Sequence, residues 1–177
     1  APAGPLSAEL RALIERRLPD SLVVPLRRYE REHAQGSEGG EAAFVLGQLH
    51  FARGEYRQAC DAFGRAGARL QPERKTVARY WAGLSWLALK APEQARAALE
   101  EVAQADPVLR PAALLGVALA WELSERPEQA LKTLEEVLAQ PPGESGPAAL
   151  ERPSALAERR PRPQIARRAR ERRRREY

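Results

Sequence analysis

The sequence has no methionine, one cysteine and two histidines, and each scarcity removes a class of site. A single cysteine cannot form an intrachain disulfide, which argues against a disulfide-stapled fold. His33 and His50 lack the short spacing of paired metal ligands, and no further ligand completes a set. Because residue 1 is not methionine, we expect either a leader cleaved ahead of Ala1 or a chain cut at that point.

Long apolar runs and catalytic motifs are also missing. No stretch approaches the roughly 18 apolar residues that a membrane-spanning helix needs. The glycine-rich segment 36–40 follows no predicted strand, so it is interpreted as a flexible break and not as a phosphate-binding loop. Cys60 is expected to be a small buried residue, His50 to fill a gap between helices, and His33 to end a helix in solvent. The sequence thus predicts a non-enzymatic protein without cofactor or metal.

The positive charge is concentrated at one end of the chain. Residues 151–177 contain 11 arginines and four glutamates, a net charge of +7, so the first 150 residues carry −2 of the overall +5. The basic character is therefore a property of the C-terminal segment and not of the body.

What the sequence does contain is a repeat. Pro-Glu-Gln-Ala at 92–95 recurs at 127–130, and Leu-Glu-Glu-Val at 99–102 recurs at 134–137. Trp86 maps onto Trp121 by the same step of 35 residues. A fixed period in the thirties is typical of stacked helix pairs.

Helical spacing of apolar residues places the elements. Helices at 7–18 and 21–33 are expected to form an N-terminal pair, a degenerate repeat or cap within 1–35. Pro25 is tolerable only near the first turn of the second helix, and Pro72 and Pro107 are interpreted as stops after helices. Three pairs are expected to follow, at 41–52 with 56–70, 74–89 with 92–104, and 110–123 with 127–139.

These three pairs resemble the tetratricopeptide repeat (TPR) family. The residues that carry the resemblance are Leu46, Gly47, Gly54, Tyr56, Ala59, Phe63 and Ala66, then Gly83, Trp86, Ala95, Leu99, Val102 and Pro107, then Ala118, Trp121, Ala130, Leu134 and Val137. The resemblance implies an all-α fold with repeats at about 41–73, 76–107 and 111–142, stacked in a right-handed superhelix. Gly47, Gly83 and Ala118 would let paired helices approach closely. Trp86 and Trp121 would be buried between successive pairs.

The family's concave groove is lined by the first helix of each pair. In this register the predicted groove residues are Phe44, Val45, Gln48, Tyr80, Trp81, Leu84, Leu115 and Leu119. Family members that clamp a terminal carboxylate carry lysine, asparagine and arginine at such places, and none is found here. An apolar groove favours a helical or extended peptide of a partner protein, although a second copy of the chain or its own terminal helices could fill it instead.

The segment 143–177 is expected to be a proline-rich linker followed by a basic extension. Its arginine cluster comprises Arg167, Arg168, Arg170, Arg172, Arg173, Arg174 and Arg175. Such a cluster suits an acidic surface, a nucleic acid or another anionic surface. Only Tyr177 offers a ring for base stacking, so sequence-specific RNA binding is not supported.

The function expected from these features is a protein–protein interaction scaffold or adaptor within a multiprotein assembly. The alternative is a nucleic-acid or anionic-surface binder that acts through the arginine cluster. The composition also resembles that of bacterial TPR adaptors of the cell envelope, which leaves the periplasm and the cytoplasm as alternative locations.

Overall fold

The computed structural model describes Leu10 and residues 21–139. Its ordered elements are the seven helices that follow Leu10, and no strand occurs within these residues. Their bounds are α2 Val23–Glu32, α3 Ser37–Ala52, α4 Tyr56–Gly67, α5 Pro72–Ala88, α6 Pro92–Ala105, α7 Arg110–Leu123 and α8 Pro127–Ala139. The predicted all-α repeat stack is confirmed. Apart from Leu10, which is helical and buried, the expected helix at 7–18 lies outside the described residues.

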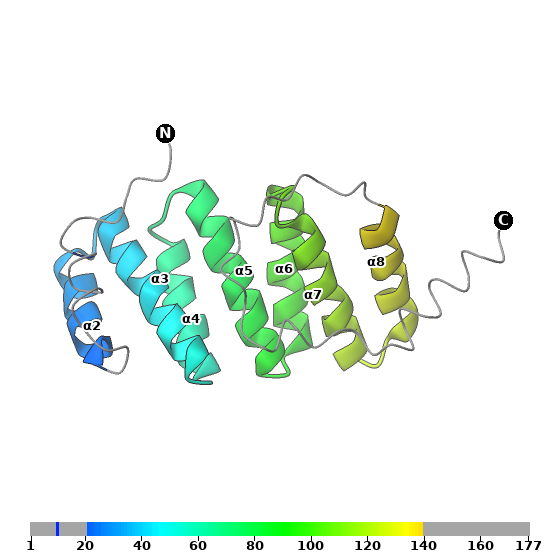
Figure 1. The fold of residues 1–177 in the computed structure, drawn as a ribbon, viewed down its shortest axis with the longest axis horizontal. Coiled ribbons are helices and arrows are strands. Elements are labelled where there is room, and N and C mark those ends of the chain that lie inside the picture. The colour runs from blue at the N-terminus through cyan, green and yellow to red at the C-terminus, as the bar shows by residue number, and fades with distance from the viewer. Residues whose placement is uncertain (1–9, 11–20, 140–177) are drawn as a thin grey trace. The chain divides into compact units, whose positions relative to one another are not determined.

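The chain divides into two compact units, residues 1–89 and 90–177. In unit 1, α2 packs on α3, α3 on α4 and α4 on α5 (Figure 1). In unit 2, α6 packs on α7 and α7 on α8. The division falls in the turn of the second predicted pair, and the domain limits proposed from the sequence stay predictions.

Unit 1 has an aliphatic core where α2 meets α3. Its buried members are Leu10, Leu22, Leu26, Tyr29, Ala42, Leu46 and Ala62. Leu22 and Leu26 lie one turn apart and face the same way, so the apolar side of α2 is covered while Val24 stays 77% exposed. Pro25 lies in the first turn of α2, where its missing N–H costs no helical hydrogen bond.

The expected flexible break at 36–40 is wrong. Helix α3 begins at Ser37 and includes Gly39 and Gly40, both of which are buried. A Cβ atom on Gly39 would collide with the carbonyl oxygen of His33, and one on Gly40 would lie 3.1 Å from the side chain of Leu70. These glycines are therefore contact points where neighbouring backbone and side chains approach α3.

Gly47 plays the part that its position predicted. A Cβ atom there would lie 2.6 Å from the ring of Phe63 on α4. The absent side chain lets the Phe63 ring lie directly against the backbone of α3. Gly83 and Ala118, at the corresponding positions, are also buried.

Prolines mark where several helices begin. Pro92 and Pro127 open α6 and α8, as expected. Pro72 was expected to stop the preceding helix, but it begins α5 instead. The correction follows from the same rule, because the first helical position does not need its N–H group.

The turns that follow α3, α5 and α7 each contain one residue with a positive φ angle. Gly54, Lys90 and Glu125 have positive φ angles of 75°, 56° and 57°. After α3 the N–H of Glu55 donates to the carbonyl of His50 at 2.9 Å, and after α7 the N–H of Arg126 donates to that of Trp121 at 3.0 Å. This is the Schellman pattern of helix ends, and its recurrence supports the repeat independently of the side chains.

Unit 2 is packed by aliphatic and small residues. Its fully or nearly fully buried side chains include Leu99, Val102, Ala113, Leu114, Val117, Ala118, Ala130 and Leu134. Leu99 and Val102 come from the α6 copy of the repeated Leu-Glu-Glu-Val, and Leu134 comes from the α8 copy. The repeat in the sequence is therefore also a repeat in the core.

Candidate functional site

The structure separates the eight predicted groove residues by exposure. Phe44, Tyr80 and Leu84 are buried, with exposed fractions of 4%, 4% and 8%. Val45, Gln48, Trp81 and Leu119 are half-buried, and Leu115 is 40% exposed. The expectation that all eight line an open surface is therefore wrong for the three buried residues.

The aromatic residues of unit 1 form a chain of ring contacts between helices. Phe63 on α4 meets Phe44 on α3 edge to face at 5.6 Å, and it stacks on Trp81 of α5 at 6.0 Å. Phe51 on α3 contacts both Trp81 and Tyr56, at 5.2 and 5.3 Å. Offset and edge-to-face rings attract one another beyond the apolar area that they bury. These aromatics hold α3, α4 and α5 together.

Phe44 is also covered by a charged side chain. The guanidinium of Arg74 lies over its ring, 4.5 Å from the centroid. Two hydrogen bonds from Arg74 to the carboxylate of Glu41, at 3.0 and 2.6 Å, fix that position. A cation over an aromatic face is favourable, so this arrangement closes the ring off from a partner.

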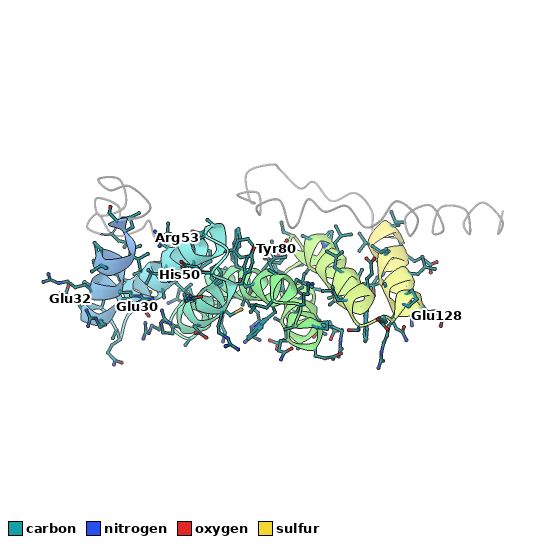
Figure 2. All side chains as sticks on the ribbon, turned by 90° about the horizontal axis from the view of Figure 1, so that it is seen from below. Glu30, Glu32, His50, Arg53, Tyr80 and Glu128 are labelled. Carbon is teal, nitrogen blue, oxygen red and sulfur yellow. The ribbon has the colours of Figure 1, made fainter. Side chains whose placement is uncertain are left out.

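Tyr80 does not present a reactive hydroxyl. It is buried on α5, and burial raises the pKa of its phenol. Figure 2 shows its place on the helix. The neutral form is the stable one near pH 7, which fits a packing role.

Unit 2 presents an apolar row along α7. Leu115, Leu119 and Leu123 lie at intervals of four residues and so occupy one face of the helix. Leu115 is 40% exposed, Leu123 is 44% exposed and Leu119 is half-buried. We call these three residues the leucine row. Leu115 and Leu119 belong to the predicted groove, and it is the exposure of Leu123 that extends the row by one turn.

The two tryptophans predicted to be buried between helix pairs are only half-buried. Trp121 on α7 lies beneath the guanidinium of Arg96 at 4.5 Å and that of Arg126 at 5.7 Å. Arg96 is held on α6 by Glu93 at 2.7 Å and Glu100 at 3.2 Å. The guanidinium groups cover part of the Trp121 indole, which was expected to be buried between successive helix pairs.

His50 and Cys60 have structural environments. His50 is buried on α3, and its Nδ1 atom lies within hydrogen-bonding distance of the Glu55 carboxylate. That hydrogen bond is the main reason that the pKa of Glu55 is lowered. Burial raises the pKa of Cys60 to about 11, so its thiol is protonated near pH 7 and is a poor nucleophile. The expectation of a small buried cysteine is confirmed.

Leu10 and residues 21–139 contain neither a metal-binding cluster nor a helix suited to cross a membrane. No cluster of three or more histidine, cysteine, aspartate or glutamate side chains in this part of the chain could hold a metal ion. None of its helices combines the length and the apolar character needed to cross a bilayer. The arginine cluster at 167–175 lies outside the described residues, so its expected role stays a prediction.

Comparison with known proteins gives one family. Residues 27–102, which run from α2 to α6, match the family model described as anaphase-promoting complex, cyclosome, subunit 3. That model represents TPR-like repeats. No curated protein and no solved structure matched the chain.

Proposed function

We propose that the chain binds a partner protein through the leucine row of α7. The proposal fits its membership of the TPR-like repeat proteins, which act as protein–protein interaction scaffolds and are typically non-enzymatic. The partner supplies an apolar face, most simply one side of an amphipathic helix. The observation that carries the proposal is the exposure of Leu115 and Leu123 on an otherwise well-packed helix.

The dimensions of the leucine row suit such a partner. Leu115 and Leu123 are eight residues apart, which at the helical rise places them about 12 Å apart along the axis. That length matches roughly two turns of a bound helix, whose own apolar residues recur at the same interval. The row can therefore meet a helical partner side chain by side chain.

The distribution of exposed apolar residues also favours unit 2. Six large hydrophobic side chains among the described residues are exposed, and four of them belong to unit 2. The four are Val108, Leu115, Leu123 and Leu138. Single exposed residues need no explanation, but Leu115 and Leu123 share one face of α7, and contiguous apolar exposure marks interaction surfaces.

A photo-crosslinking amino acid at position 119 tests the proposal in cells that express the full chain. We expect discrete protein adducts that disappear when Leu115→Glu or Leu123→Glu is added, because a buried carboxylate is costly in an apolar contact. The matched control is Leu89→Glu, which places the same charge on an exposed leucine of unit 1. Circular dichroism should show unchanged helix content in all three variants.

Equal adducts in the leucine-row variants and the control would contradict the proposal. An adduct with twice the mass of the chain would identify a second copy as the occupant. Binding through the arginine cluster would behave differently, because contacts to phosphate weaken steeply as salt rises and apolar contacts do not.

A further inference from the structure

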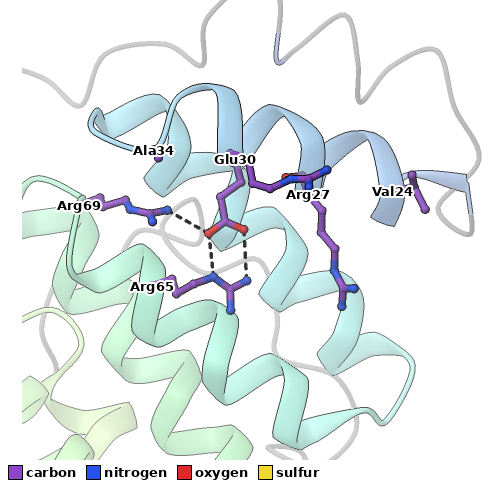
Figure 3. A pocket seen from close by; sticks show the side chains of 7 residues that line it. Val24, Arg27, Glu30, Ala34, Arg65 and Arg69 are labelled. Carbon is purple, nitrogen blue, oxygen red and sulfur yellow. Dashed lines mark hydrogen bonds and ion pairs between the residues drawn. The ribbon is translucent and has the colours of Figure 1, made fainter.

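A buried carboxylate joins α2 to α4 in unit 1. Glu30 on α2 is only 6% exposed. It accepts hydrogen bonds from Nε and Nη2 of Arg65 at 2.7 and 3.2 Å, and from Nη1 of Arg69 at 2.9 Å. Figure 3 shows the Glu30 carboxylate pointing from α2 toward Arg65 and Arg69. Burial by itself would raise the pKa of Glu30, but the two arginines together lower it, so the carboxylate is ionised near pH 7.

A pocket of about 600 Å³ opens beside this carboxylate, between α2 and α4 (Figure 3). Arg27 and Arg31 line it from α2, Arg65 lines it from α4, and Arg69 lines it from the turn that follows α4. Glu30 is the one acidic side chain among the described residues of the lining. Four cations against one anion leave a strong positive excess in a concave site of ligand-binding size.

The four arginines do not have the same task. Glu30 fixes the guanidinium groups of Arg65 and Arg69, which remain 43% and 26% exposed and keep N–H groups that do not bond to it. Arg27 and Arg31 are exposed on the opposite wall. Two preoriented guanidinium groups and two adaptable ones can surround a single anionic ligand.

We propose that this pocket binds the oxyanions of an acidic segment in a partner protein, either clustered carboxylates or a phosphorylated side chain. Planar guanidinium groups pair with both kinds of oxyanion through two parallel hydrogen bonds. Residues 1–89 carry 13 arginines and lysines against 10 aspartates and glutamates, a net charge of +3, and four of those arginines line this one pocket. The pocket lies on a different unit from the leucine row, so the inference does not depend on the proposed function.

The alternative is that the ion pairs of Glu30 with Arg65 and Arg69 only hold the helices together. In that case Arg27 and Arg31 would not be needed for binding an anionic peptide. The experiment therefore targets Arg27 and Arg31, which take no part in holding Glu30. The full chain carrying Arg27→Ala and Arg31→Ala is compared with the wild type. The matched control is the pair Arg28→Ala and Arg57→Ala, which removes equal charge from exposed positions on the same two helices outside the pocket.

Three fluorescent peptides serve as probes: one with four adjacent glutamates, one with a phosphoserine, and one with glutamines in their place. Fluorescence anisotropy at about 50 mM salt limits screening of the charges. We expect Arg27→Ala with Arg31→Ala to weaken binding of at least one anionic peptide about tenfold, while the control pair changes it less than about twofold. Whichever anionic peptide binds more tightly identifies the source of the oxyanions.

The arginine cluster at 167–175 is present in every variant, so any binding that it contributes is the same for the pocket pair and the control pair. Equal weakening in the pocket pair and the control pair would overturn the proposal, because it would show a general charge effect. Unchanged binding in the pocket pair, or tighter binding of the glutamine peptide than of both anionic ones, would also overturn it. A melting temperature equal to that of the wild type shows that the pocket variant is folded.

Discussion

In unit 1, aromatic rings and a buried ion pair add to the aliphatic contacts between helices, whereas in unit 2 the buried side chains are mostly leucine, valine and alanine. Phe63 contacts rings on both α3 and α5, and Glu30 joins α2 to α4. In unit 2, Leu99, Val102 and Leu134 fill the equivalent space. The same helix–turn–helix repeat is therefore stabilised in two ways, one by large directional contacts and one by many small apolar ones.

This difference decides which helix face is left open. In unit 1, Phe44 on α3 is covered by Arg74 and packed against Phe63. In unit 2, Leu115 and Leu123 on α7 have no such cover and remain exposed. At a groove position, an aromatic residue such as Phe44 is covered by side chains of neighbouring helices and so contributes to stability. A leucine at such a position, such as Leu115, remains exposed and can contact a partner.

The sharpest test of the comparison is Phe63→Ala. Removing this fully buried ring takes away contacts with both Phe44 and Trp81, so we expect a loss of about 3–5 kcal/mol in the free energy of unfolding. Leu115→Ala in unit 2 should change it by less than about 0.5 kcal/mol, because the residue is exposed. Urea denaturation followed by circular dichroism measures both.

Similar losses for the two variants would show that Leu115 is a core residue and that the leucine row is not a free surface. A small loss for Phe63→Ala would mean that the ring contacts of unit 1 are not what holds its helices together. Separate transitions for the two units would be visible in the same curves, and Phe63→Ala should then shift the transition of unit 1 alone.

The next prediction concerns the close approach at the start of α3. Gly39→Ala places a methyl group against the carbonyl of His33, a backbone atom that cannot move aside, and we expect a cost of about 1–3 kcal/mol. Gly64→Ala on α4 meets open space and should stabilise the helix by about 0.5–1 kcal/mol. Thermal melts of the two variants give the opposite signs, and stabilisation by Gly39→Ala would restore the interpretation of 36–40 as a flexible break.

Most of the fold could be predicted because its signals are local. The bounds of α7 and α8 agree with the predicted 110–123 and 127–139, since apolar periodicity and Pro127 act within a few residues. The start of α3 was missed because glycine disfavours a helix on its own. The low helix propensity of Gly39 is offset by its close packing against the backbone of Glu30 and His33, at the end of α2, and the sequence alone does not show that contact.

The candidate site was predicted less well because exposure is a property of neighbours. Phe44 became a core residue through Arg74, whose own position depends on Glu41, 33 residues earlier. The arginine pocket was not predicted either, because Glu30 and Arg65 lie 35 residues apart on different helices. That spacing equals the repeat period, so pairing opposite charges across one period is a signal that could have found the contact.

The smallest expected effect compares the turns of the two units. Glu125 in unit 2 has a φ angle of 57°, which strains a residue with a Cβ atom, whereas Gly54 occupies the corresponding turn of unit 1 without strain. Glu125→Gly should therefore stabilise the protein by about 0.5–1 kcal/mol, the relief of strain exceeding the entropy that glycine adds to the unfolded chain. Gly54→Ala should cost about 1 kcal/mol for the converse reason.

The control for Glu125→Gly is Glu135→Gly, which makes the same change at an exposed position inside α8. At position 135 the only effect of glycine is its low helix propensity, so we expect the free energy of unfolding to fall by about 1 kcal/mol. Opposite signs for the two substitutions, measured by denaturant midpoint at constant slope, would attribute the gain to the backbone angle of the turn. A loss at both positions would mean that the side chain of Glu125 stabilises its turn by more than its φ angle costs, and the two units would then close their helix pairs by different means.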